Sequence, residues 1–191
     1  MDLSTKYLGM DLKSPLVVSP SPLSDDLDNI KKMEDNGAAA VVLHSLFEEQ
    51  LTHESTSLNQ NLMQGAESFA EALTYFPDMG DYRMGPDGYL EHLRKAKEAV
   101  DIPVIGSLNG VSDGGWTEYA KKMEEAGADA IELNVYFIPT DPEMTGVHVR
   151  ENTEKLLASV RKSSATAVGV KLSHYFSAVP YVAKRLSDFG P

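Results

Sequence analysis

The chain has 191 residues, of which 42% are hydrophobic and 24% charged, and this is enough for one well-filled core. Its 17 basic and 29 acidic residues leave a formal net charge of -12, which repels phosphate backbones, so we expect no nucleic-acid partner. The complete lack of cysteine excludes disulfides, thiolate metal ligands and thiol nucleophiles. No apolar run approaches the roughly 18 residues of a membrane span, and no signal-peptide pattern opens the chain, so we expect a cytoplasmic protein without membrane contact.

The first fifteen residues differ from the rest. Residues 5–12 turn at Gly9 and predict a small antiparallel hairpin that covers the bottom of a barrel. Beyond them, five short apolar runs that do not alternate with polar residues predict strands buried on both faces, at residues 16–19, 39–43, 103–108, 130–134 and 167–172. Helical spacing follows each run, at residues 25–36, 87–100, 116–126, 152–163 and 178–188.

This alternation of strand and helix predicts a parallel sheet. Residues 33–38 and 123–128 align without gaps, each with a glycine after the helix, which suggests a repeated helix-to-strand corner. Residues 48–85 are long for a strand-to-helix connection, and a polar loop of this length is typical of a functional segment.

Five such units fit two architectures. A doubly wound open sheet suits 191 residues, whereas a closed (β/α)8 barrel takes about 250. Against the open sheet, the first strand-to-helix turn, residues 19–24, has two prolines and no glycine, so it cannot form the close phosphate turn of a nucleotide-binding sheet.

Both architectures place their sites at the carboxyl ends of the strands, where this chain carries polar residues. Lys171 is the most specific candidate, because an ammonium group in an apolar strand needs an anionic partner. The alternative is that its aliphatic chain packs against the protein while the ammonium group reaches water. Asn134 offers a donor and an acceptor to a flat heterocycle, or else caps a turn. His44 is either a base or ligand, or a hydrogen-bonded structural residue. No metal-loop spacing and no Gly-x-Ser-x-Gly elbow occurs, so we predict no metal and no serine hydrolase.

Several segments together resemble the dihydroorotate dehydrogenase-like family, FMN-dependent (β/α)8-barrel oxidoreductases of pyrimidine biosynthesis. The motifs occur in the family's order at residues 14–21, 82–86 and 103–108. The most specific are Ile131-Glu132-Leu133-Asn134 and residues 168–172, which Tyr175-Phe176 follow.

The resemblance implies bound FMN and a small-molecule substrate that reacts at a CH-CH bond. It places Lys171 near N1 and O2 of the isoalloxazine and Asn134 beside flavin and substrate. The full set of implied flavin-binding residues is Ser19, Pro20, Ser21, His44, Ser45, Ser107, Asn109, Asn134 and Lys171.

The chain departs from the family at three positions. His44 replaces a lysine, Phe137 replaces a catalytic cysteine or serine, and Pro139 lies near the place of a substrate-binding asparagine. Phenylalanine cannot accept a proton, so the catalytic base is unknown, with Tyr136, Thr140 and Asp141 as substitutes.

The chain ends after the fifth unit, so we expect a single domain over residues 1–191 with the fold of a partial (β/α)8 TIM barrel. The glycine-rich loops that hold the FMN phosphate would be missing, and a partner chain or second copy would cover the open strand edges. Two other functions stay open: a degenerate barrel fragment acting as a non-catalytic binding or assembly subunit, and a barrel or open-sheet enzyme acting on small phosphorylated metabolites.

Overall fold

The computed structural model describes residues 1–47, 86–109, 113–135 and 138–190. An antiparallel hairpin, β1 (Thr5–Tyr7) and β2 (Met10–Leu12), opens the chain. A parallel sheet follows, with strands β3 (Val17–Val18), β4 (Ala40–Phe47), β5 (Val104–Asn109), β6 (Ala130–Asn134) and β7 (Ala167–Lys171). The hairpin turns at Gly9 as predicted, with φ of 78°.

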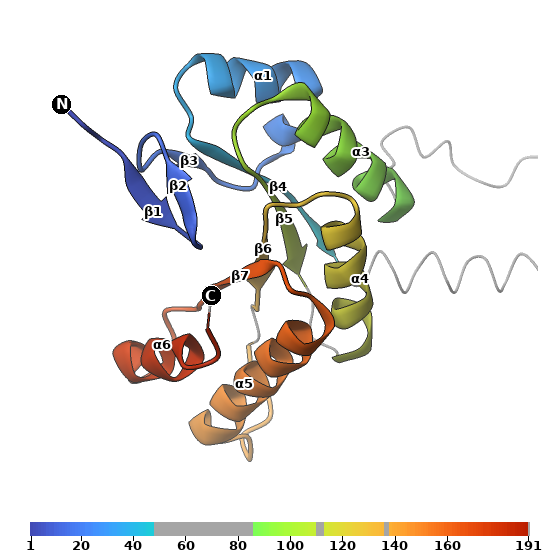
Figure 1. Cartoon of the computed structure of the whole chain (residues 1–191). Coiled ribbons are helices and arrows are strands. Elements are labelled where there is room, and N and C mark those ends of the chain that lie inside the picture. The colour runs from blue at the N-terminus through green and yellow to red at the C-terminus, as the bar shows by residue number, and fades with distance from the viewer. Residues whose placement is uncertain (48–85, 110–112, 136–137, 191) are drawn as a thin grey trace, which may run out of the picture.

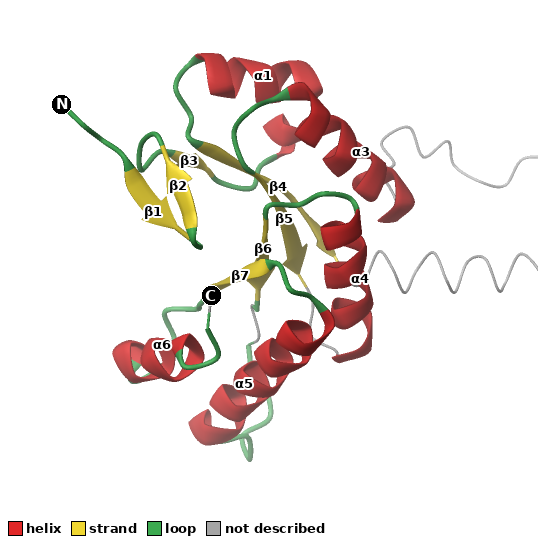
Figure 2. Cartoon of the chain, in the orientation of Figure 1, coloured by secondary structure: helices red, strands yellow, loops and turns green. Residues whose placement is uncertain are grey.

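Helical segments connect the strands. They are the 3-10 helix η1 (Pro22–Asp25) and the α-helices α1 (Leu27–Asp35), α3 (Pro86–Ala99), α4 (Asp113–Glu125), α5 (Gly146–Ser163) and α6 (Val179–Ser187). The helices α1, α3, α4 and α5 line one side of the curled sheet and the hairpin lies on the other (Figure 1; Figure 2). None of the described helices is long and apolar enough to cross a bilayer.

The strand order is β3-β4-β5-β6-β7, and every neighbouring pair is parallel. An open doubly wound sheet reverses its order at a switch point, whereas a barrel adds its strands sequentially. The sequential order and the curl therefore favour part of an α/β barrel. The two predicted helix-to-strand corners are also present, because Gly37 and Gly127 take φ of 96° and 95°, a left-handed conformation that favours glycine.

The sheet is buried on both faces, which is why its strands do not alternate in the sequence. The large hydrophobic cluster fills the space between sheet and helices and includes Val41, Leu43, Val104 and Ile131. A smaller cluster lies on the concave face, where hairpin residues pack on sheet residues. Its members are Leu12, Ala39, Ala40, Val42, Ile105 and Ala130, with Leu8, Met10, Val17 and Ala167 packed against them.

Two predicted boundaries differ most from the structure. The strand expected to end at residue 43 continues to Phe47 as β4, so His44 lies inside a strand. Helix α5 begins six residues before the predicted start at residue 152, because Thr145 and His148 form a capping box at Gly146.

Candidate functional site

The parallel register arranges the residues of the concave face in rows. Side chains alternate between faces along a strand, so every second residue joins a row. The lowest row is Val42, Ile105, Ala130 and Ala167. The middle row is Ser45, Ser107, Glu132 and Gly169, and the C-terminal row is Phe47, Asn109, Asn134 and Lys171. The lowest row is therefore apolar, and the polar side chains lie in the two rows nearer the carboxyl ends of the strands.

The C-terminal row brings together three residues that the sequence predicted as separate candidates. Asn109, Asn134 and Lys171 are direct partners on β5, β6 and β7. The Oδ1 of Asn134 is buried and has no hydrogen-bond partner among the described residues. A buried acceptor without a donor costs free energy, so this atom suits a ligand that brings an N–H or O–H group.

Glu132 lies in the middle row directly below Asn134's row. It is 8% exposed, and its Oε1 lies 3.6 Å from the Nζ of Lys171 and 3.5 Å from the Oγ of Ser107. Burial raises the pKa of Glu132, while the positive charge of Lys171 and the hydrogen bonds from Lys171 and Ser107 oppose that rise. The anionic partner that a strand-end lysine requires is therefore on the neighbouring strand.

The sequence did not assign a role to Glu132, although it forms part of the Ile131–Asn134 motif. Its signal is present in the period of the strand: Glu132 and Asn134 are two residues apart, so they share a face of β6. A charged residue in an otherwise apolar strand, on the same face as a candidate amide, marks it as a site residue.

The serines of the middle row continue the polar contacts. The Oγ atoms of Ser45 and Ser107 lie 2.8 Å apart, and Ser107 is fully buried. Together with the bond from Ser107 to Glu132, this forms a polar line across β4, β5 and β6. Ser45 and Ser107 therefore lie beneath the C-terminal row, where Ser107 contacts Glu132 and Ser45 contacts Ser107.

The hairpin reaches the same row from the concave side. A Cβ added at Gly169 would lie 3.5 Å from the Tyr7 hydroxyl and 3.4 Å from Leu8, so the hairpin tip packs closely on β7. Burial raises the pKa of Tyr7, and the negative charge of Glu132 raises it further. The hairpin tip thus lies close enough to Glu132 for Tyr7 to experience its charge.

His44 lies elsewhere. The pairing of β4 with β5 shifts between Val42 and Ser45, and this irregularity directs His44 toward the helices. Its Nδ1 lies 2.6 Å from Oδ1 of Asp25, and its ring meets that of Tyr89 edge-on with centroids 5.0 Å apart. The expectation that His44 ends its strand is wrong, and it does not share a row with Asn134 and Lys171.

The predicted residues Ser19, Pro20 and Ser21 follow β3. Because β3 pairs with β4 only as far as Val18 and Val41, Ser19 lies below the C-terminal row in the register. Ser21 accepts a 2.8 Å hydrogen bond from the Oγ of Ser24, which fixes the turn into η1.

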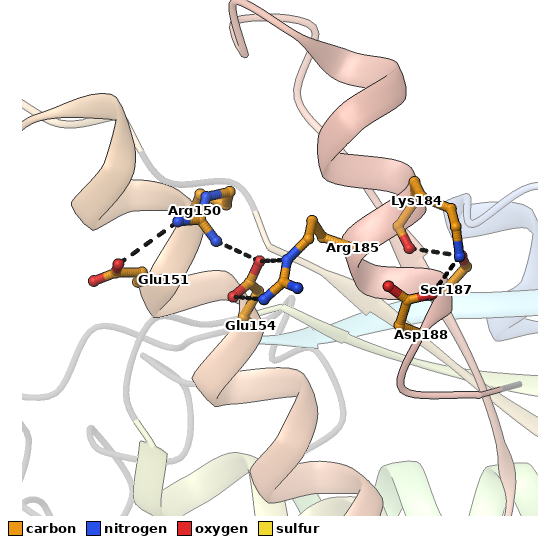
Figure 3. Close-up of polar contacts among 7 residues, drawn as sticks. All are labelled: Arg150, Glu151, Glu154, Lys184, Arg185, Ser187 and Asp188. Atoms are coloured by element: carbon orange, nitrogen blue, oxygen red, sulfur yellow. Dashed lines mark hydrogen bonds and ion pairs between the residues drawn. The ribbon is translucent and has the colours of Figure 1, made fainter.

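A cavity of about 450 Å³ opens between the first turns of α5 and α6. Its wall is mainly aromatic and aliphatic, with Tyr175, Phe176 and Tyr181 among its members and Arg150 as the charged residue. Arg150 is paired with Glu154 at 2.6 Å (Figure 3). Its guanidinium also lies 5.9 Å from the centre of the Tyr181 ring. Since both Glu151 and Glu154 already pair with it, Arg150 is not a free anion site.

The proposed substitutes for the catalytic base are only partly described. Tyr136 and Phe137 lie outside the described residues, whereas Thr140 and Asp141 are exposed in the segment before α5. The Oδ1 of Asp141 accepts a 2.9 Å hydrogen bond from the amide of Glu143, as expected of a turn residue. Among the described residues, no group of three or more histidine, aspartate or glutamate side chains is placed to hold a metal ion.

No family model matches the chain. It is 28% identical over 188 residues to the dihydroorotate dehydrogenase B (NAD(+)) catalytic subunit of Thermoplasma acidophilum, covering 96% of the chain and 58% of that protein. The corresponding subunit of Methanocaldococcus jannaschii is 26% identical over 98% of the chain and 60% of its own length. The NAD-dependent dihydropyrimidine dehydrogenase subunit PreA of Escherichia coli K12 is 27% identical over 90% of the chain and 42% of its own length.

These relatives confirm the resemblance to the dihydroorotate dehydrogenase-like family, and their names support an oxidoreductase. The chain spans little more than half the length of the dihydroorotate dehydrogenases that it matches.

Solved structures agree on the fold alone. A 4-hydroxy-tetrahydrodipicolinate synthase from Methylacidiphilum fumariolicum SolV matches with a TM-score of 0.52 at 13% identity, over 90% of this chain and 49% of that one. A phosphonopyruvate hydrolase matches with a TM-score of 0.51 at 16% identity, over 93% and 56%.

Proposed function

We propose that this chain forms the flavin-ring side of an FMN-dependent oxidoreductase site of the dihydroorotate dehydrogenase-like type, acting on a CH-CH bond of a small molecule. The observation that carries the proposal is the C-terminal row, in which Asn109, Asn134 and Lys171 are neighbours. The similarity to dehydrogenases over most of the chain supports the same class of reaction.

The donor set of the row fits a flavin ring. The Oδ1 of Asn134, which has no partner within the described part of the chain, can accept a hydrogen bond from a ring N–H. The Lys171 ammonium can donate to a ring carbonyl or stabilise negative charge. When bound, FMN would supply the acceptor for two electrons. The residues of the chain would hold the ring and compensate its charge.

The substrate of this site is expected to differ from dihydroorotate. The resemblance places a proton-accepting cysteine or serine at the position of Phe137, and a phenyl ring accepts no proton. We therefore expect dihydroorotate to be a poor substrate, even for a form of the protein that holds FMN.

A partner chain or a further barrel segment is the expected cover for the sheet edges. Within the described sheet, β3 and β7 each pair on one side only, and exposed parallel edges promote aggregation. Several of the relatives are named as subunits. The alternative function, a non-catalytic binding or assembly subunit, is favoured by a separate observation: Val147, Tyr175 and Tyr181 are exposed apolar side chains that line the cavity between α5 and α6.

Flavin titration separates the two functions. FMN and riboflavin are titrated into the chain and followed by flavin fluorescence, because the row would contact the ring that both share. We expect both to bind, and Lys171→Ala and Asn134→Ala each to weaken binding about tenfold, which corresponds to about 1.4 kcal/mol. The exposed α5 residue Lys155 provides the control, since Lys155→Ala leaves the row intact. Absence of flavin binding, or binding that ignores both row variants, would favour the assembly subunit.

A further inference from the structure

We infer that Glu132 is a positioning residue: it holds the Lys171 ammonium against the C-terminal row so that the lysine faces a bound flavin ring instead of solvent. This inference rests on the proposed function for its ligand. Its structural basis is the pairing of Glu132 with Lys171 across β6 and β7.

The two side chains differ in their freedom. The Lys171 side chain is 47% exposed and its long stem can reach water, whereas the Glu132 side chain is only 11% exposed. A half-exposed lysine keeps much of its conformational freedom unless a partner holds its ammonium group. The Glu132 carboxylate is such a partner, because it lies in a strand and its neighbours are packed.

Described residues on the two neighbouring strands contact Glu132. Ser107 on β5 reaches Oε1 at 3.5 Å, and Lys171 on β7 reaches the same oxygen at 3.6 Å. Tyr7 on the hairpin and Tyr89 on α3 are the other titratable groups that feel its charge. Both are phenols, which remain neutral at pH 7. Of the described groups that act on Glu132, Lys171 is therefore the one with a positive charge.

The ionised form of Glu132 has opposite effects on stability and on ligand binding: it destabilises the fold, but it is the form that pairs with Lys171. Because burial outweighs its interactions, the ionised form of Glu132 is disfavoured by folding, and its pKa is raised. Protonation of Glu132 therefore stabilises the folded state. This contribution is fully present below the pKa of glutamate in the unfolded chain, about 4.3, and is lost as the pH rises through the pKa of Glu132 in the folded chain. A neutral isostere avoids this cost at pH 7.

The Glu132→Gln variant tests the inference because the two explanations differ in sign. If Glu132 were only a negative charge near the row, its removal would strengthen the binding of FMN, which carries a negative phosphate. If Glu132 positions Lys171, its removal weakens FMN binding. We expect the affinity to fall about three- to tenfold, as for the loss of one charge-assisted contact. At the same time we expect the melting temperature at pH 7 to rise by about 2–4 °C, with no rise at pH 4.

Two further variants complete the experiment. In a Lys171→Ala background, Glu132→Gln should cause no additional loss of FMN affinity, because the residue that it positions is gone. Glu125→Gln, at the exposed end of α4, is the charge-matched control and should change neither affinity nor stability. A stable Glu132→Gln variant that binds FMN as tightly as the wild-type chain, or more tightly, would overturn the inference.

A ligand-free measurement keeps the inference distinct from the proposed function. In the chain labelled with ¹³C at glutamate side chains, the Glu132 carboxyl is followed through pH by NMR, with Glu132→Gln assigning its signal. We expect Lys171→Ala to raise the Glu132 pKa further, because it removes the charge that opposes the rise. An unchanged titration would refute the pairing itself. If the wild-type chain does not bind FMN although Glu132 pairs with Lys171, the proposed function is refuted and the pairing is not.

Discussion

The backbone N–H of Ser107 donates a 2.9 Å hydrogen bond to the hydroxyl of Tyr89, which is fully buried on α3. This bond lies where the pairing of β4 with β5 shifts, between Val42 and Ser45. A register shift interrupts the regular ladder of a sheet, and a buried amide must then find another acceptor. Burial also raises the pKa of Tyr89 well above its usual value, so the phenol stays neutral in this position.

Tyr89→Phe removes that acceptor while it preserves the ring. We expect the variant to lose about 1–3 kcal/mol of unfolding free energy, because the Ser107 amide is left buried without a partner. Chemical denaturation of wild type and variant measures this loss. Tyr175→Phe, whose side chain is exposed, should leave stability unchanged. Equal stability of Tyr89→Phe and wild type would mean that the hydroxyl is dispensable at the register shift.

Two glycines of the sheet, Gly106 and Gly169, should respond differently to substitution by alanine. A Cβ at Gly106 would lie 2.8 Å from the sulfur of Met123 and 3.3 Å from Leu93, both fully buried. We expect Gly106→Ala to cost about 1–3 kcal/mol through overpacking. A Cβ at Gly169 meets its nearest neighbour, Leu8, at 3.4 Å, an ordinary contact, so Gly169→Ala should be neutral or slightly stabilising.

Thermal unfolding of both glycine variants checks this pair. Met123→Ala then tests the cause, since Gly106→Ala should cost less in that background than alone. A Gly106→Ala variant that is as stable as Gly169→Ala would show that Met123 moves aside without cost.

Much of this fold is predictable because the strands are buried on both faces. The run at residues 130–134 coincides with β6, and the glycines at 37 and 127 mark both helix-to-strand corners. The start of α5 was harder to predict, since Val147 and Val149 are β-branched and weak helix formers. There, the Thr145 cap and its partner His148 outweigh propensity.

The candidate site was predictable to the extent that it depends on strand ends. Asn109, Asn134 and Lys171 end three strands and meet in one row, because parallel neighbours align their ends. His44 could not be placed, because the register shift in β4 that turns it toward α3 has no sequence signal of its own. Glu132 was overlooked because its partner lies 39 positions along the chain, on the next strand of the sheet.

The contact between α5 and α6 predicts a defined response to acid. Glu154 accepts hydrogen bonds from Arg185 on α6 at 3.1 and 3.3 Å and from Arg150 on its own helix (Figure 3). The bond from Arg185 is the main cause that holds the pKa of Glu154 below its usual value, and the bond and charge of Arg150 add to it. The stability that this provides is present above the unfolded pKa of about 4.3 and is lost as the pH falls through the folded pKa.

Glu154→Gln should therefore lower the melting temperature by a few degrees at pH 7, and the deficit should shrink progressively below about pH 4.3. Circular dichroism melts between pH 7 and pH 3 measure this difference. Glu151 is the matched control, because it lies on the same helix, 3.6 Å from the same Arg150, yet its side chain is 46% exposed and forms no ion pair with the described residues of α6. Glu151→Gln should change stability little, since exposed ion pairs contribute little. A Glu154→Gln deficit that stays constant down to pH 3 would show that the carboxylate acts through packing and not through its charge.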